Sequence, residues 1–186
     1  MKRALTIVLV LLLTVAALTA CGGGGNNNNN SGGDSASVSG ETFDTTIFSV
    51  LVPKGWMAFN ASDFFKDYAD LGYDPYGVSV YKGAKTEWDQ LTCPGMQITY
   101  YHPDKTLWEP SSDYYEDVVD LGTVKIGSWT WKGFTGTSSG YPIAQLWTGD
   151  NDGDQFMISI WTEMDKGKIS LDDADVKAII ESIKVN

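Results

Sequence analysis

The sequence predicts an α+β fold in which a central antiparallel β-sheet is sandwiched by helices. Short apolar segments with the alternation typical of strands follow one another, and Gly-rich or Asp-rich turns separate them, as in an antiparallel meander. Amphipathic segments with helical periodicity stand between or after these runs of strands. This order favours an antiparallel sheet covered by helices over a parallel nucleotide-binding sheet, in which strands and helices alternate regularly.

The predicted strands differ in how far they are buried. Residues 47–52 are apolar on both alternating sides, as in a central strand, whereas residues 96–102 alternate large side chains with Gln97 and Thr99. Pro53, Lys54 and Gly55 form a turn between the first two strands. The complete set of predicted strands is 47–52, 56–59, 78–81, 96–102, 123–126, 129–134, 143–148 and 156–162.

Three helices are predicted from apolar stripes that lie opposite acidic faces. The first covers residues 62–71, the second begins after Pro110 and covers 111–121, and the third covers 170–183. Ser170 and Asp173 have the spacing of a capping box at the start of the third helix. Its buried stripe is predicted as Val176, Ile179, Ile180 and Ile183.

The first twenty residues have the pattern of an export signal. Lys2 and Arg3 form a positive start, residues 4–17 are almost entirely apolar, and residues 18–20 (Leu-Thr-Ala) precede Cys21. The apolar run is shorter than the roughly 20 residues that a membrane-spanning helix needs. Residues 1–20 are therefore predicted to be a signal peptide.

The Leu-Thr-Ala-Cys order is similar to the lipobox of bacterial lipoproteins. This resemblance implies cleavage before Cys21, a diacylglycerol on its sulfur, and a location at the extracytoplasmic face of the cell membrane. Two acyl chains give stable anchoring. An ordinary secretory signal with a cysteine nearby is the alternative, and the low-complexity segment that begins at Gly22 favours the lipoprotein.

The mature chain divides into a tether and one domain. Residues 21–40, which are the cysteine and a segment rich in Gly, Asn and Ser, cannot form a packed face and are predicted to be a flexible linker with a reach of about 25 Å. Residues 41–186 have the length of a single globular domain and contain every Trp of the chain.

The charge of the mature chain excludes one class of partner. The formal net charge of the whole chain is −11, and removal of Lys2 and Arg3 leaves 11 basic residues, all Lys, against 24 acidic ones, a net charge of −13. Such a chain is repelled by polyanions. Nucleic-acid binding is therefore excluded.

Candidate catalytic residues lack the partners that catalysis needs. Residues 136–140 fit the G-x-S-x-G pattern of a hydrolase, but a strand rather than a helix is predicted after them, and His102 comes earlier in the chain. This segment is predicted to be a hairpin loop. Cys93 has no intramolecular partner once Cys21 is lipidated, and is predicted to be a small buried residue rather than a reactive thiol. We expect no enzymatic activity.

A cluster of oxygen-bearing side chains at residues 150–154 has two interpretations. Asp150, Asp152 and Asp154 alternate around Gly153, as in part of a calcium loop, but Ser159 occupies the position where an EF-hand has a bidentate Glu. Asp, Asn and Gly also form tight turns between strands. A turn is the favoured interpretation, and weak calcium binding is the alternative. No other cofactor is expected.

Two further features are candidate interaction surfaces. Asp113, Glu116, Asp117 and Asp120 lie on one side of the predicted second helix. Such a stripe could meet a basic partner, but it is usually a solvated helix face. The alternating Trp129 and Trp131 could stack on sugars if they were exposed, or could fill the core, which is the favoured interpretation.

Several motifs resemble those of PsbP-like domains. They are residues 48–56 with the Pro-Lys-Gly-Trp turn, residues 131–134, residues 153–156 and residues 179–184. The resemblance covers residues 43–186 and implies an α/β/α sandwich and a binding role, as in the photosystem II PsbP subunit and a Ran-binding nuclear-import protein of the same fold. It transfers no functional residue, because the matching positions are core and turn positions.

The sequence therefore predicts a membrane-anchored extracytoplasmic lipoprotein that binds an unidentified protein or cell-wall ligand without catalysis. A glycan-binding or calcium-dependent module associated with the cell wall is the alternative.

Overall fold

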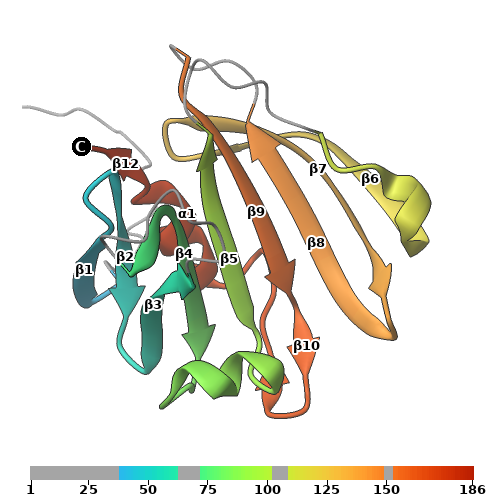
Figure 1. Cartoon of the computed structure of the whole chain (residues 1–186). Coiled ribbons are helices and arrows are strands. Elements are labelled where there is room, and N and C mark those ends of the chain that lie inside the picture. Colours follow the sequence, from blue (N-terminus) through green and yellow to red (C-terminus); the bar gives the residue numbers. More distant parts are fainter. Residues whose placement is uncertain (1–37, 63–71, 102–108, 149–152) are drawn as a thin grey trace, which may run out of the picture. The chain divides into compact units, whose positions relative to one another are not determined.

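The computed structural model describes residues 38–62, 72–101, 109–148 and 153–186, and most of their regular structure is β (Figure 1). The largest element is a seven-stranded sheet in which every pair of neighbouring strands is antiparallel. Its strands, in spatial order, are β3 (Trp56–Ser62), β4 (Tyr73–Lys82), β5 (Gly95–Tyr101), β9 (Gln155–Trp161), β8 (Tyr141–Thr148), β7 (Trp129–Ser138) and β6 (Glu116–Ile126).

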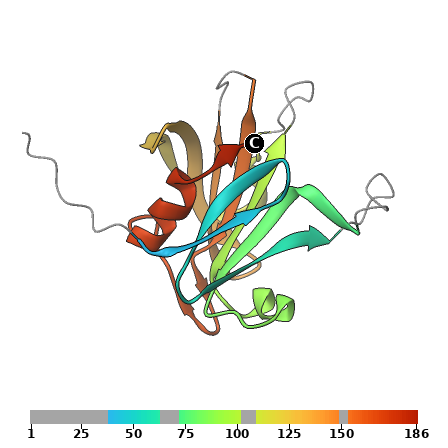
Figure 2. The same cartoon turned by 90° about the vertical axis from the view of Figure 1, so that its left-hand side faces the viewer.

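A second layer lies beside one part of this sheet (Figure 1). It consists of the helix α1 (Ala174–Glu181) and a three-stranded sheet in the order β1 (Gly40–Asp44), β2 (Phe48–Pro53) and β12 (Lys184–Val185). Figure 2 shows α1, β1 and β2 from this side. The remaining elements are a two-stranded hairpin, β10 (Glu163–Met164) and β11 (Gly167–Lys168), and the short 3-10 helices η2 (Glu87–Leu91) and η3 (Ser112–Tyr114).

The main core lies between the two layers. Its largest fully buried side chains include Trp131, Phe48 and Phe156, which come from β7, β2 and β9. Trp129 Nε1 donates a hydrogen bond to the carbonyl oxygen of Ile183 at 3.0 Å, which ties β7 to the chain that follows α1. The prediction that Trp129 and Trp131 fill the core is confirmed, since they are 8% and 0% exposed.

The predicted α+β sandwich is wrong. Among the described residues α1 is the single α-helix, and it covers the large sheet together with three strands. The helix predicted over 170–183 is confirmed in part: α1 begins at Ala174, after the N-cap Asp173 instead of at Ser170, and ends at Glu181, and the predicted stripe is buried. The helix predicted over 111–121 is η3 followed by the edge strand β6. Residues 63–71, which make up nearly all of the helix predicted over 62–71, lie outside the described residues.

Tertiary pairing explains why residues 116–126 form a strand. The segment contains β-branched residues such as Val118 and Val119, and it pairs along β7, whose backbone groups would otherwise lack partners on that side. Two register shifts interrupt the pairing, and Glu116, Asp117 and Asp120 are exposed. Bulges and charges on an edge strand prevent pairing with other chains. The residues of the predicted acidic helix face are therefore exposed positions of η3 and of an edge strand.

The G-x-S-x-G segment is a hairpin, as predicted. Ser138 pairs with Tyr141, so that Ser139 and Gly140 alone form the loop between β7 and β8. Both residues have positive φ, 52° and 84°, which is the signature of a type I′ turn.

Residues 1–37 lie outside the described structure, so the predicted signal peptide, the lipidated Cys21 and the boundary at residue 20 stay predictions; Gly40, predicted as the last residue of the linker, is the first residue of β1. Within the described ranges, no helix has both the length and the apolar character that crossing a membrane requires.

Candidate binding site

The large sheet has a second face, which points away from the main core and which we call the outer face. On β9 the buried core residues Phe156, Ile158 and Ile160 alternate with Met157 and Ser159, which therefore point to the outer face. The outer face is partly covered by residues 109–115, the segment that leads into β6.

A row of uncharged polar side chains crosses the outer face. Ser79 pairs with Gln97, Gln97 with Ser159, and Ser159 with Gln145, on β4, β5, β9 and β8. We call these four residues the polar row. Ser79 and Gln145 are both only 4% exposed, although polar side chains are costly to bury without hydrogen bonds. The row therefore marks a place where the sheet presents hydrogen-bonding groups instead of a second apolar core.

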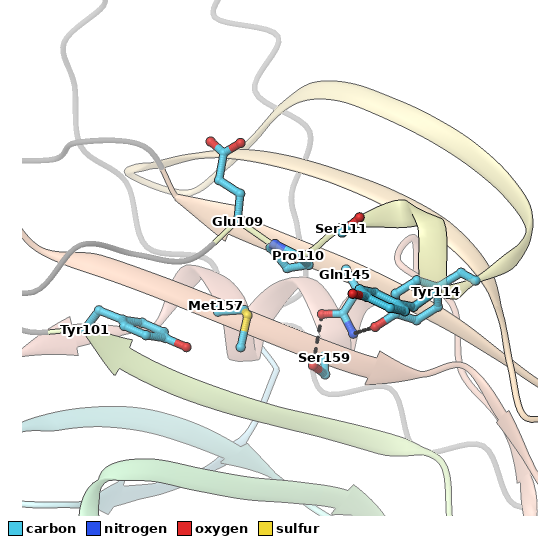
Figure 3. Close-up of a pocket in the computed structure, with 9 residues that line it drawn as sticks. Tyr101, Glu109, Pro110, Ser111, Tyr114, Gln145, Met157 and Ser159 are labelled. Carbon is cyan, nitrogen blue, oxygen red and sulfur yellow. Dashed lines mark hydrogen bonds between the residues drawn. The ribbon is translucent and has the colours of Figure 1, made fainter.

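A cavity of about 250 Å³ lies over one end of the polar row (Figure 3). Tyr101 lies at one end and Tyr114 at the other, with Met157, Gln145 and Ser159 between them. Burial raises the pKa of the Tyr101 phenol, so this group remains protonated and available as a hydrogen-bonding group at neutral pH.

Gln145 is the centre of the hydrogen bonding in this cavity. Its Oε1 accepts a hydrogen bond from Ser159 Oγ at 2.9 Å, and its Nε2 donates one to Tyr115 Oη at 3.1 Å (Figure 3). An amide nitrogen has two N–H groups, and one is used among the described residues. Tyr115 Oη accepts its bond and so keeps a proton that it can donate. The network therefore holds donors ready for a ligand.

A glycine allows the covering segment to approach the sheet closely. A Cβ added at Gly136 on β7 would lie 3.1 Å from Tyr115 Cβ and 3.0 Å from the carbonyl oxygen of Glu116. Both separations are shorter than side chains normally tolerate. Tyr115 then packs edge-on against Phe134, with ring centroids 5.0 Å apart.

A second cavity, of about 410 Å³, lies beside the first and shares Pro110 with it. Phe134 and Trp147 line it, and their rings meet edge-to-face with centroids 6.1 Å apart. Trp147 Nε1 is buried without a hydrogen-bond partner among the described residues. We call the two neighbouring cavities together the outer-face groove; their lining residues run from Tyr101 on β5 to Asp120 and Thr123 on β6, and residues of the segment 109–115 line both cavities.

The outer-face groove has little net charge. Three charged side chains line it, and two of them pair: Lys132 Nζ lies 3.4 Å from Glu109 Oε1, with both groups exposed. The third is Asp120. Such an exposed pair contributes at most about 1 kcal/mol to stability. Because the two charges of this pair cancel, the groove carries a formal charge of only −1, although the whole chain is strongly acidic.

The residues singled out as a calcium site are only partly described. Asp150 and Asp152 lie outside the described residues, whereas Asp154 comes directly before β9 and accepts a hydrogen bond from Tyr100 Oη at 2.6 Å. The described ranges contain no group of three or more His, Cys, Asp or Glu side chains that could hold a metal ion. Calcium binding stays a hypothesis.

Cys93, whose alternative interpretation is a reactive thiol, does not line the groove. Cys93 is free and buried, as predicted, in a small cluster with Phe59 and Tyr81. His102 lies outside the described residues.

Sequence reasoning missed the residues that line the groove. Gln145 and Ser159 each interrupt an apolar strand with one polar residue, which is the only signal that the sequence contains. Such an interruption is ambiguous until the register is known, because register alone places the two side chains opposite each other.

No known protein family and no curated protein matches the chain. Two solved structures are similar in fold. A crystal structure of a Bacteroides thetaiotaomicron protein has a TM-score of 0.44 and 16% identity, and the match covers 79% of this chain and 48% of that protein. This chain thus spans about half the length of the Bacteroides protein.

The other is the solution structure of cyanobacterial PsbP (CyanoP) from Synechocystis. It has a TM-score of 0.41 and 14% identity, and the match covers 85% of this chain and 98% of that one. It belongs to the family that the sequence motifs resemble. Neither likeness assigns a function.

Proposed function

We propose that this chain is a lipid-anchored extracytoplasmic binding protein, that its ligand occupies the outer-face groove, and that it binds without catalysis. The export signal and the lipobox that ends at Cys21 support the anchor. The linker over residues 22–40 supports a domain held away from the membrane surface, where it can reach a ligand.

The observation that supports binding at the groove is the network around Gln145. Ligand sites are concave, largely apolar and equipped with a few convergent polar groups. Gln145, Ser159 and Tyr115 converge in this way between aromatic side chains. Burying such a network is costly unless its polar groups form hydrogen bonds, and a bound ligand would accept hydrogen bonds from the donors that have no partner within the network.

The chemistry of the groove supports binding rather than catalysis. Burial raises the pKa of the Tyr101 phenol, so this group stays protonated and can donate a hydrogen bond. The G-x-S-x-G segment is a two-residue turn between strands, which is not the strand–turn–helix context that a nucleophile needs.

The anchor can be tested with the two cysteines of the chain. Cys21→Ala should move the protein from the membrane fraction to the soluble fraction or stall its processing, and Cys93→Ala, the matched control, should leave it in the membrane. Mass spectrometry should find the diacylglycerol on the mature N-terminal cysteine. A soluble, unacylated wild-type protein would exclude the anchor.

The site can be tested by hydrogen–deuterium exchange of the purified protein with and without isolated host cell envelope. Bound ligand should slow exchange in residues 109–115 and 143–147, which line the groove. Tyr114→Ala should remove this protection, because the side chain is 79% exposed at the rim and contributes contact area rather than stability. Protection confined to other parts of the sheet would place the site elsewhere.

A further inference from the structure

The side chains of the outer-face groove also indicate the class of its ligand, an inference that rests on the proposed function. We propose that the groove binds an uncharged saccharide chain that lies across the strands, from β5 toward β6.

The hydrogen-bonding groups of the groove suit hydroxyl groups. Gln145, Ser159 and Tyr115 are uncharged and present both donors and acceptors. A sugar ring carries hydroxyls, each of which donates one hydrogen bond and accepts others, so it matches a mixed set of this kind. A purely apolar ligand, such as an acyl chain, would displace water from these groups and leave the donors that the network does not use unpaired.

The apolar groups of the groove are placed at intervals between the polar ones. Tyr101 and Tyr114 lie at opposite ends of the first cavity, with Met157 between them (Figure 3), and Trp147 lines the second cavity. Tyr and Trp combine a broad apolar ring with one polar atom. The C–H faces of a pyranose ring pack on such surfaces while its edge forms hydrogen bonds.

Charge excludes acidic saccharides. The groove contains Glu109, Asp120 and Lys132, a formal sum of −1, and the mature chain has a net charge of −13. An anionic polymer would meet a repulsive field with a single lysine to compensate it. A neutral chain meets no such barrier.

The dimensions of the groove fit an oligomer rather than a single sugar. Its lining residues come from five adjacent strands, β5, β9, β8, β7 and β6. Neighbouring strands lie about 4.8 Å apart, so five of them span roughly 19 Å. A chain of several linked sugar units therefore reaches both cavities, whereas a single sugar occupies one.

An extended peptide fits the groove less well. Peptides that bind sheets usually pair their backbone with a strand edge. Four of the five strands that line the groove, β5, β9, β8 and β7, already pair with strands on both sides. The fifth, β6, is an edge strand whose pairing is interrupted by two register shifts, which disfavours the addition of another strand. A peptide would therefore have to rely on the side chains alone.

The test is isothermal titration calorimetry with the full-length protein, purified in a detergent that has no sugar headgroup. The probes are neutral pentasaccharides (chitopentaose, xylopentaose, cellopentaose and mannopentaose), hexagalacturonate as an anionic saccharide, and hexaproline and hexaalanine as neutral peptides. We expect saturable binding of at least one neutral pentasaccharide and at least tenfold weaker binding of hexagalacturonate.

Variants separate the ligand class from the location of the site. Tyr114→Ala and Tyr101→Phe should each weaken pentasaccharide binding at least fivefold, whereas Trp88→Ala, which alters an equally exposed aromatic on η2, should not change it. Circular dichroism and melting temperature confirm that each variant is folded.

Three outcomes overturn the inference. If no pentasaccharide binds, or hexagalacturonate binds as tightly, the ligand is not a neutral saccharide. If a peptide binds in its place and Tyr114→Ala abolishes that binding, the groove remains the site and only the ligand class is wrong. If a pentasaccharide binds and neither groove variant weakens it, the site itself lies elsewhere, and the proposed function fails at the groove.

Discussion

Gln145 on β8 and Tyr115, the residue before β6, are 30 residues apart in the chain, and a hydrogen bond of 3.1 Å joins Gln145 Nε2 to Tyr115 Oη. This bond holds the segment of residues 109–115 on the outer face. The side-chain amide of Gln145 also accepts a hydrogen bond from Ser159 Oγ. One buried side chain thus shapes a wall and part of the floor of the groove.

Replacing this amide should destabilise the protein. Gln145→Leu keeps the volume but leaves the hydroxyls of Ser159 and Tyr115 without their partner, which should lower the free energy of unfolding by about 1–3 kcal/mol. Urea unfolding measures the change, and Gln90→Leu on η2 is the control. A double-mutant cycle with Tyr115→Phe should show a coupling of about 0.5–3 kcal/mol; strictly additive effects would mean that the bond contributes nothing.

Gly136 should be required because it leaves room for the neighbouring segment, and not because of its backbone conformation. Gly136→Ala places a Cβ about 3 Å from Tyr115 and Glu116, so it should push the segment 109–115 away from β7 and cost about 1–3 kcal/mol. Ser138→Ala, two residues further along β7, is the control. Thermal unfolding of both variants provides the comparison, and equal melting temperatures would show that the close approach is unimportant.

Asp89 should make stability depend on pH in the acid range. The hydrogen bond from Lys166 Nζ, followed by those from the backbone N–H groups of Lys85 and Thr86, holds the pKa of the Asp89 carboxyl well below its ordinary value. A carboxyl with a lowered pKa in the folded state stabilises the fold above its unfolded value, about 4. This stability is lost as the pH falls through the lowered pKa.

In the Asp89→Asn variant, the free energy of unfolding should therefore depend less on pH below about pH 4 than in the wild type. Asp165→Asn changes an exposed carboxylate in the turn between β10 and β11, and it should leave the curve unchanged. Urea midpoints between about pH 2 and pH 7 give the comparison. Parallel curves for wild type and Asp89→Asn would contradict the role of Asp89.

Calcium should have little effect on the fold. The Asp154 carboxylate already accepts a hydrogen bond from Tyr100, and a cation would compete with that bond. After chelator treatment, millimolar calcium should leave the melting temperature almost unchanged. Specific binding at 100 times the dissociation constant would instead add about 2.7 kcal/mol. A rise of several degrees with calcium but not magnesium, abolished by Asp152→Ala, would establish a calcium site.

Local patterns in the sequence predicted much of the secondary structure. The apolar stripe Val176, Ile179 and Ile180 predicted α1, and alternation predicted the strands around Trp131, Leu146 and Ile158. These segments agree with prediction because periodicity depends only on which face a residue buries. The resemblance to PsbP-like domains rested on turn and core residues of the same kind.

The segment 111–121 shows where local patterns fail. Tyr114, Val118 and Leu121 have helical spacing, yet the chain there joins the edge of β7. Pairing with the free edge of β7 stabilises the segment more than its weak preference for a helix does. The sequence of the segment gives no sign that this edge is available. The prediction therefore placed a covering helix where the structure has η3 and the edge strand β6.

The sequence by itself determined the export signal pattern, the acidic charge and the positions of most strands, because each of these is a property of neighbouring residues. Only the tertiary structure decided the groove. It brings together Tyr101, Tyr115, Gln145 and Ser159 from four separate segments, and strand register sets which of them meet. Register depends on the pairing of distant strands, and a shift of a strand by one residue would turn its groove side chain, Tyr101, Gln145 or Ser159, to the other face.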